Sequence, residues 1–188
     1  MSDNKGKDGE HGALALLAIA AIDDNSLEVM RFSETNVPDM GQDIFATASN
    51  QWVQKFGEIT IPNYEPPEKF KNKDDDFKRR LRFDVKTSES IDKTKIQKAA
   101  ADIKKHANTD THIILGGTLK PAAEKELERV RKDYPSKEIL HVSDSGIKDF
   151  SEKLNIPVER LFPHIKFLLD EPQGEGPQKK KDDEGDGE

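Results

Sequence analysis

Apolar residues recur at helical spacing in several segments of the chain. The clearest is 93–106, where Ile96, Ala99 and Ile103 share one face and most of the lysines lie off it. Similar patterns predict a buried N-terminal helix over 13–22, a helix over 121–134, a helix through Ile147, Phe150 and Leu154, and a short helix over 157–168. We therefore expect each of these helices to pack one face on other elements.

Short apolar or alternating runs predict strands between the helices. The candidates are 27–33, 43–48, 54–61, 80–86, 112–115 and 138–142, and Gly116-Gly117 forms a tight turn after the fifth of them. The segment 62–78 holds three prolines in a Lys/Asp mixture, which predicts an exposed loop inserted between two strands. This order of elements predicts an α/β sandwich, a mixed central sheet flanked by helices.

The chain length and the two polar ends predict one folded domain. At 188 residues with 33% hydrophobic residues, the sequence supports a single modest core, which we place in 12–170. Residues 1–11 and 171–188 carry almost no apolar side chains, so burial cannot offset the entropy of ordering them. We expect both ends to be disordered tails.

Composition narrows the cellular setting. The sequence has no cysteine, which excludes disulfides and thiolate metal sites and suits a reducing cytoplasm. The apolar run 13–22 is shorter than the roughly 20 residues of a spanning helix, and its upstream flank mixes acids with lysines, unlike a signal peptide. We expect a cytoplasmic protein with no membrane partner.

Charge is distributed unevenly along the chain. The net charge is −7, but 69–105 holds thirteen Lys and Arg against seven Asp and Glu, a local excess of six positive charges. The remainder therefore carries −13. The positive segment permits contact with an anionic partner, although a solvated lysine-rich helix face explains it equally well.

The positive segment surrounds a pattern with candidate chemistry, Phe83-Asp84-Val85-Lys86. Alternate side chains of a strand share a face, so Asp84 and Lys86 would project together while Val85 points into the core. An acid-glycine-acid turn, Asp39-Met40-Gly41-Gln42-Asp43, precedes an earlier strand candidate. The five histidines show no ligand pairing at i, i+3 or i+4, which gives no support for a zinc site.

With these landmarks in this order, the chain resembles the Mrr-type restriction endonucleases, whose superfamily pairs an upstream acid with an acid-x-lysine strand. The resemblance covers roughly 27–154. It also rests on the 113–117 strand and glycine turn before Lys120-Pro121, and on the strand end at 139–144. It implies a restriction-endonuclease-like three-layer sandwich and a Mg²⁺- or Mn²⁺-dependent endonuclease, a hydrolase of DNA phosphodiester bonds. A homodimer that cuts both strands is compatible with it.

Residue by residue, the resemblance implies that Asp43 and Asp84 bind the metal beside the Val85 carbonyl. Lys86 would assist the attacking water, and Gln97 would stand where such enzymes place a further polar helper. Oxygen ligands suit Mg²⁺, and a lysine can orient or deprotonate a water. The neighbouring cations are candidates for phosphate contacts: Arg79, Arg80, Arg82, Lys93, Lys95 and Lys98.

Other interpretations of the same residues stay open. Asp43 alone is typical of a turn, Asp84 and Lys86 alone of an exposed ion pair worth under about 1 kcal/mol, and Gln97 of ordinary helix surface. The family more often has glutamate at the position of Asp84. A second hypothesis is therefore a catalytically inactive endonuclease fold that binds nucleic acid or protein, and a third is an accessory protein whose acidic tails engage a basic partner.

Overall fold

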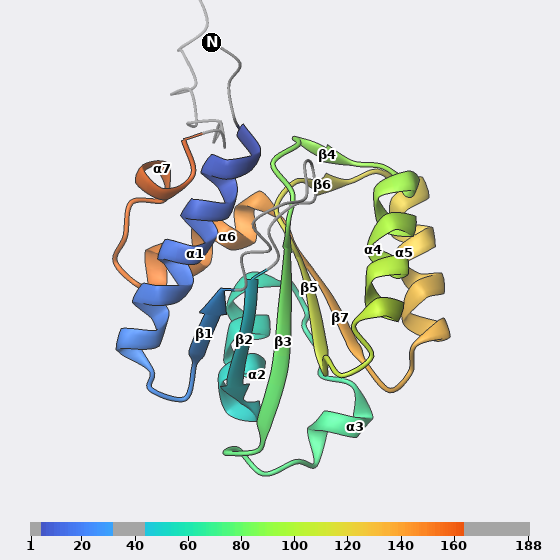
Figure 1. Ribbon diagram of the computed structural model, residues 1–188, viewed down its shortest axis with the longest axis horizontal. Helices are drawn as coiled ribbons and strands as arrows, with labels where there is room; N and C mark the ends of the chain where they lie inside the picture. The colour runs from blue at the N-terminus through green and yellow to red at the C-terminus, as the bar shows by residue number, and fades with distance from the viewer. Residues whose placement is uncertain (1–4, 32–43, 164–188) are drawn as a thin grey trace, which may run out of the picture.

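The computed structural model describes residues 5–31 and 44–163. Within these ranges the main sheet has five strands in the order β1-β2-β3-β5-β7. The pairs β1/β2 and β2/β3 are antiparallel, whereas β3, β5 and β7 run parallel (Figure 1). The bounds are β1 Glu28–Arg31, β2 Ile44–Ser49, β3 Lys78–Val85, β5 Thr111–Leu115 and β7 Glu138–Val142. The predicted α/β class with a mixed sheet is confirmed.

One face of the sheet is covered by α1 Lys5–Asp23, α2 Asn50–Thr60, α6 Asp144–Lys153 and α7 Val158–Leu161. Apolar residues of these helices, such as Leu17, Phe56 and Phe150, form one core cluster with every second residue of the strands, such as Phe83 and Leu115. Phe56 lies edge-on to both Phe83 and Phe150, with ring centroids 6.2 and 4.9 Å apart. We call this side the α1 face of the sheet.

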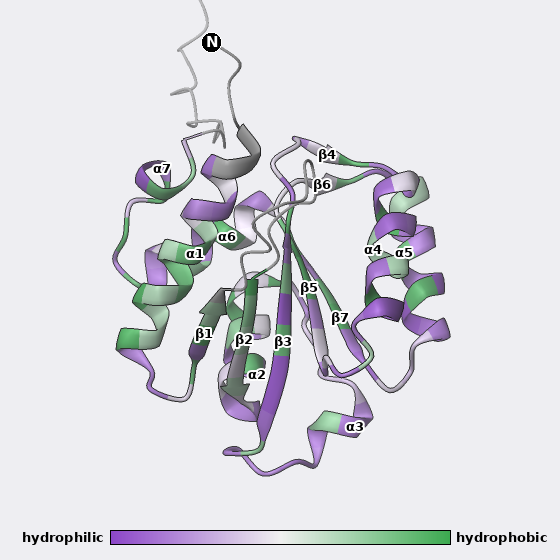
Figure 2. Cartoon of the chain, viewed as in Figure 1, coloured by the Kyte–Doolittle hydropathy of each residue, from purple (hydrophilic) through white to green (hydrophobic). Residues whose placement is uncertain are grey.

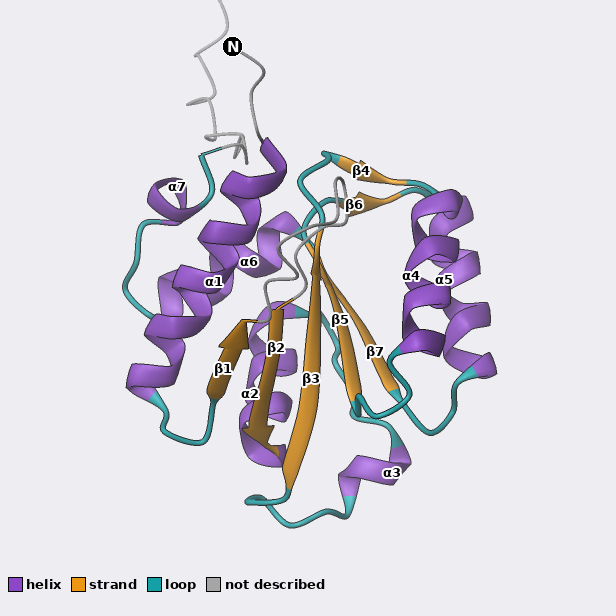
Figure 3. Ribbon diagram, viewed as in Figure 1, coloured by secondary structure: helices purple, strands orange, loops and turns teal. Residues whose placement is uncertain are grey.

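The opposite face carries α4 Lys93–Lys105 and α5 Pro121–Asp133. Ile96 and Ile103 of α4 and Leu127 of α5 pack with Ile114 and Ile139 of the sheet in a second cluster. Helices therefore lie on both sides of the strands (Figure 3), and hydrophobic residues alternate with hydrophilic ones along α4 and α5 (Figure 2). We call this side the α4 face.

The strand predicted over 54–61 is wrong, because residues 54–60 belong to helix α2 and Ile61 is its C-cap. Trp52, Val53 and Phe56 are buried at helical spacing on the α1 face. The Ser49 side chain caps the helix by accepting a hydrogen bond from the Trp52 backbone N–H at 3.1 Å. The apparent alternation after Gln54 reflected only the C-terminal half of an amphipathic helix.

The exposed loop predicted over 62–78 is confirmed for most of its residues, but Phe70 and Tyr64 anchor the segment to the rest of the protein. It contains the short helix α3, Glu68–Lys71, whose Phe70 is fully buried. The guanidinium carbon of Arg79 lies 3.7 Å from the centroid of the Phe70 ring. The Tyr64 hydroxyl donates to Glu138 at 2.6 Å; burial and this carboxylate raise the Tyr64 pKa, so the phenol stays a donor.

Several boundaries also differ from those predicted. Helix α1 begins at Lys5, so residues 5–11, expected in a disordered tail, are helical. Two short strands that the sequence did not indicate, β4 Ser90–Ile91 and β6 Thr118–Leu119, form a separate parallel pair. The end of the last predicted helix and the 171–188 tail lie outside the described residues. Among those that are described, no helix combines the length and apolarity needed to span a bilayer.

Candidate nuclease site

Strand β3 carries a row of charged residues on the α4 face of the sheet. Arg80, Arg82 and Asp84 alternate with the α1-face residues Leu81 and Phe83, as the two-residue period of a strand requires. Asp84 stands beside Ile114 of the parallel strand β5. These charged side chains therefore follow β3 from near its first residue, Lys78, to its carboxyl end, and Lys86 comes directly after the strand.

Asp84 and Lys86 form a mostly buried ion pair. The Lys86 Nζ donates to Asp84 Oδ1 at 2.7 Å, and the two side chains are only 23% and 10% exposed. The other carboxylate oxygen, Asp84 Oδ2, is buried without a hydrogen-bond partner. The predicted projection to one side is confirmed, and the alternative of an exposed surface pair does not hold, because Asp84 is buried.

The Lys86 backbone is clamped by the turn that follows β5. Its N–H donates to the Leu115 carbonyl at 2.7 Å. Gly116 has a φ of 102°, and a Cβ there would overlap the Lys86 carbonyl oxygen. Asp144 accepts a hydrogen bond from Gly117 N–H at 2.7 Å and so fixes the turn from the start of α6. The sequence indicated the glycine turn, but it gave no signal for this role of Asp144.

Lys95 has a structural position in place of the predicted phosphate contact. Its ammonium donates to Ser88 Oγ at 2.7 Å and to the Ser90 carbonyl at 2.9 Å. It thereby holds the 86–92 connection against the first turn of α4, whose N-cap is Asp92. Two of its three donors are used within the protein.

The prediction that Arg79 and Arg82 contact phosphate is wrong, because both side chains are buried. Arg79 points to the α1 side and donates to Glu138, Thr111 and Asn50. Arg82 lies against the His112 ring, and its Nη2 is 3.8 Å from Asp102. Alternation along β3 puts only one of these two arginines on the face of Asp84.

The remaining predicted cations stay accessible. Arg80 is exposed and pairs with Asp110 at 3.1 Å, Lys93 lies 3.8 Å from Glu126, and Lys98 is exposed on α4. Gln97 also lies on the exposed side of α4, and it contributes to the lowered pKa of Glu126 on α5, after the larger effect of Arg129. No described contact brings Gln97 to Asp84 or Lys86, so its predicted helper role gains no support.

The second predicted metal ligand, Asp43, and the turn that begins at Asp39 lie outside the described residues. Within 5–31 and 44–163, no group of three or more His, Asp or Glu side chains could hold a metal ion. The described residues therefore supply one carboxylate, Asp84, whose buried and unpartnered Oδ2 has the chemistry to accept a cation. The donor set fits a hard divalent metal only if further oxygens join it.

His112 of β5 lies beside Arg82 in the charged row of β3. It is almost fully buried, and burial together with the Arg82 guanidinium holds its pKa well below the usual 6.5. The ring is therefore neutral at pH 7 and can lie against a cation. Sequence spacing could not reveal this contact, because the two residues are 30 positions apart and meet only through β3/β5 pairing.

Comparison with known proteins finds no family model that matches the chain and no curated protein with significant similarity to it.

Proposed function

We propose that the protein is a metal-dependent nuclease that hydrolyses phosphodiester bonds of DNA, on a restriction-endonuclease-like three-layer sandwich. One observation carries the proposal: the Asp84–Lys86 pair ends the central strand, with one carboxylate oxygen buried and lacking a donor. An unsatisfied buried acceptor costs free energy, so it is expected to have a partner in the working protein. A divalent cation would be such a partner.

The proposed ligands are the Asp84 carboxylate, the Val85 carbonyl and the Asp43 carboxylate. Asp43 directly precedes Ile44, the first residue of β2, and Ile44 pairs with Phe83, the neighbour of Asp84. When bound there, Mg²⁺ or Mn²⁺ would lower the pKa of a coordinated water and stabilise charge on the phosphate oxygens.

Lys86 would position the reacting groups. An ammonium has three donors, and Asp84 Oδ1 takes one of them. Two N–H groups are left to orient a water or a phosphate oxygen beside the carboxylate. The backbone bond from Lys86 to Leu115 and the close approach of Gly116 hold this residue in place.

The test is cleavage of supercoiled plasmid with Mg²⁺ or Mn²⁺, read as nicked and linear products. We expect Lys86→Ala and Asp84→Asn each to lower the rate at least 100-fold with an unchanged circular dichroism spectrum. Lys153→Ala, at an exposed lysine of α6, is the matched control and should cut normally. Plasmid left intact by the wild-type protein with both metals would refute the proposal.

A second candidate function is a catalytically inactive module that binds nucleic acid or protein. It is favoured by the occupied Lys86 ammonium and by the single carboxylate that the described residues supply for a metal. A salt-dependent gel shift without cleavage would select it. Asp43→Asn separates the two candidates further, because only a metal-binding Asp43 would lose thermal stabilisation by Mg²⁺ on substitution.

A further inference from the structure

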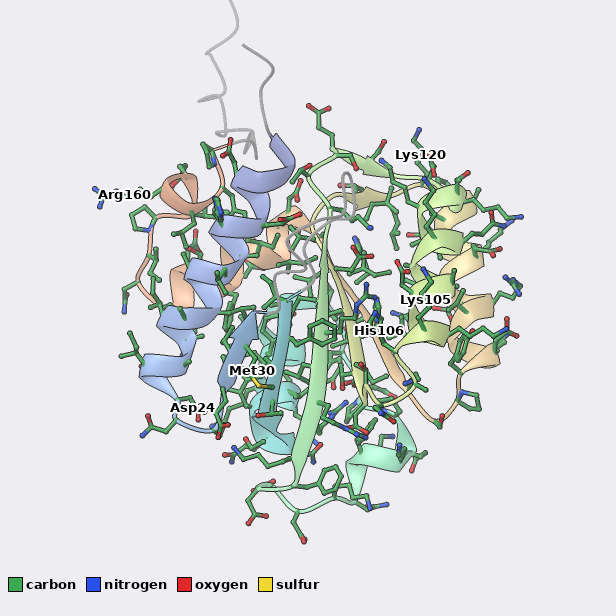
Figure 4. The ribbon with its side chains drawn as sticks, viewed as in Figure 1. Asp24, Met30, Lys105, His106, Lys120 and Arg160 are labelled. Carbon is green, nitrogen blue, oxygen red and sulfur yellow. The ribbon has the colours of Figure 1, made fainter. Side chains whose placement is uncertain are left out.

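The α4 face of the sheet holds a groove of about 310 Å³ that lies away from the Asp84–Lys86 pair. Its floor is the open side of the antiparallel strands, and its wall is the end of α4 with the loop to β5. Met30, Phe45, Thr47 and Arg80 are on the floor, and Lys105, His106, Asn108 and Thr109 are on the wall. Figure 4 shows Met30 on one side of β3 and Lys105 and His106 on the other.

The groove exists because α4 and α5 do not extend over β1 and β2. Their apolar cluster contains strand residues from β5 and β7, and neither Met30 nor Phe45 belongs to it. Met30 is 43% exposed, which makes it one of the few exposed large apolar side chains in the described part of the chain. A partly apolar floor that no helix covers, beside the strands that α4 and α5 do cover, is a candidate binding surface.

Aromatic rings line the groove from both sides. Phe45 of β2 and His106 at the end of α4 meet edge to face, with centroids 5.4 Å apart and an interplanar angle of 64°. Rings packed this way are rigid, so little side-chain entropy is lost when a flat group stacks on them. Base stacking on aromatic side chains is the usual basis of single-strand recognition.

The surroundings of the groove favour an anion. Arg80 on the floor and Lys105 on the wall are 58% and 63% exposed, and Asp110 and Asp102 pair with them. The Lys137 ammonium adds a third cation on the 106–109 loop of the wall. Glu28 of β1, which pairs with the groove residue Thr47, is matched by Lys78. Three cations therefore stand against two carboxylates, an excess of one positive charge.

Backbone oxygens of the wall do not offset that excess. The Lys137 ammonium donates to three carbonyls of the 106–109 loop, those of His106, Ala107 and Thr109. Carbonyl oxygens satisfied in this way present less negative potential to an incoming phosphate. Asn108 and Thr109 of the loop still supply polar side chains at the groove.

The groove and the candidate nuclease site are reached from the same strand, with the buried Arg82 between them. Arg80, on its floor, and Asp84 lie on the same face of β3, four residues and thus about 13 Å apart at 3.3 Å per residue. A ligand that joins a flat apolar group to a phosphate and continues toward Asp84 is a polynucleotide strand with an unpaired base.

We infer that this groove binds an unpaired nucleotide of a polynucleotide, its base against Phe45 and His106 and its phosphate near Arg80 and Lys105. The inference rests on the proposed function in its choice of a polynucleotide as ligand. It deepens that function, because it specifies a single-stranded or locally unpaired substrate.

A binding measurement in EDTA, in which no metal-dependent cleavage takes place, tests this inference. Full-length protein in EDTA is titrated into fluorescein-labelled dT12 and, separately, into the same strand within a duplex, with fluorescence anisotropy as the readout. We expect the single strand to bind at least fivefold more tightly. Unlabelled dTMP is the competitor that distinguishes a polynucleotide from a free nucleotide and should compete poorly.

Substitutions locate the binding. His106→Ala should weaken dT12 binding at least fivefold, and Lys105→Ala should weaken it and reduce the slope of log K against log salt by about 0.7. Met30→Glu changes an exposed position on β1 and should also weaken dT12 binding. This second variant leaves helix α4 unchanged. Lys153→Ala, on the helix layer of the opposite face, is the control and should bind normally.

Three results would overturn the inference: duplex bound as well as single strand, dTMP competing as well as dT12, or groove variants that bind like the control. Its failure is distinguishable from failure of the proposed function. Lys86→Ala tests cleavage, whereas the groove variants are read by dT12 affinity in EDTA, where no cleavage takes place. A wild-type protein that binds dT12 through the groove but never cuts would keep this inference and refute the nuclease.

Discussion

The buried pair formed by Arg79 and Glu138 gives the sharpest test of how this fold is held together. Their side chains are 0% and 2% exposed, and the pair joins β3 to β7 across β5. Glu138 also accepts from Tyr64, and Arg79 donates to Asn50 at 3.3 Å. One carboxylate therefore ties the 62–78 insertion to the sheet, and we consider the substitution Glu138→Gln.

The expected cost follows from burial. Glutamine keeps the shape and one acceptor, but it leaves the Arg79 guanidinium charged and without a counter-ion inside the protein. Loss of one partner of a buried pair costs about 3–5 kcal/mol, mostly for the uncompensated charge. At about 2–4 °C per kcal/mol for a chain of this size, the melting temperature should fall by about 6–20 °C.

The assay is urea unfolding followed by the fluorescence of Trp52, the single tryptophan, which is buried on the α1 face. The matched control is Glu128→Gln, which removes the same charge from a 60% exposed residue paired with Arg131. Exposed pairs contribute about 0–1 kcal/mol, so the control should change the free energy of unfolding little.

Adding Arg79→Met to Glu138→Gln removes the uncompensated charge, so we expect it to recover part of the lost stability. If Glu138→Gln costs no more than Glu128→Gln, the charge is not desolvated as the structure indicates. A double variant no more stable than Glu138→Gln would show that packing, not charge, sets the cost.

Two further predictions concern the candidate site and its surroundings. Gly116→Ala should lower the free energy of unfolding by more than about 2 kcal/mol in a thermal melt, because the positive φ is strained for alanine and the new methyl group meets the Lys86 carbonyl. The control Thr118→Ala, at an exposed neighbouring residue, should be nearly neutral in the same melt. His112 stays neutral when folded but takes up a proton below about pH 6.5 when unfolded, so its contribution to stability is lost as pH falls below 6.5, by up to about 1.4 kcal/mol per pH unit. His112→Gln should flatten that part of the pH dependence between pH 7 and 5 in urea titrations, and an unaltered profile would show that His112 is not the group responsible.

The local pattern was enough for most elements of the second half of the chain. Helices α4 and α5 and strand β7 appear where amphipathic spacing and short apolar runs predicted them, because each buries one face on the same sheet. The two-residue period of β3 was likewise enough to bring Asp84 and Lys86 together. These are properties of neighbours along the chain, which a sequence displays directly.

Tertiary structure decided which charged side chains are exposed to solvent and where the surface forms a groove. Arg79 and Arg80 are adjacent in sequence, yet the first is buried against Glu138, 59 residues away, and the second is exposed at a groove. That groove needs β2 and the loop after α4 to meet across β3. Burial and the supply of counter-ions depend on such distant partners, and for this reason the sequence could propose a nuclease site but could not sort its cations.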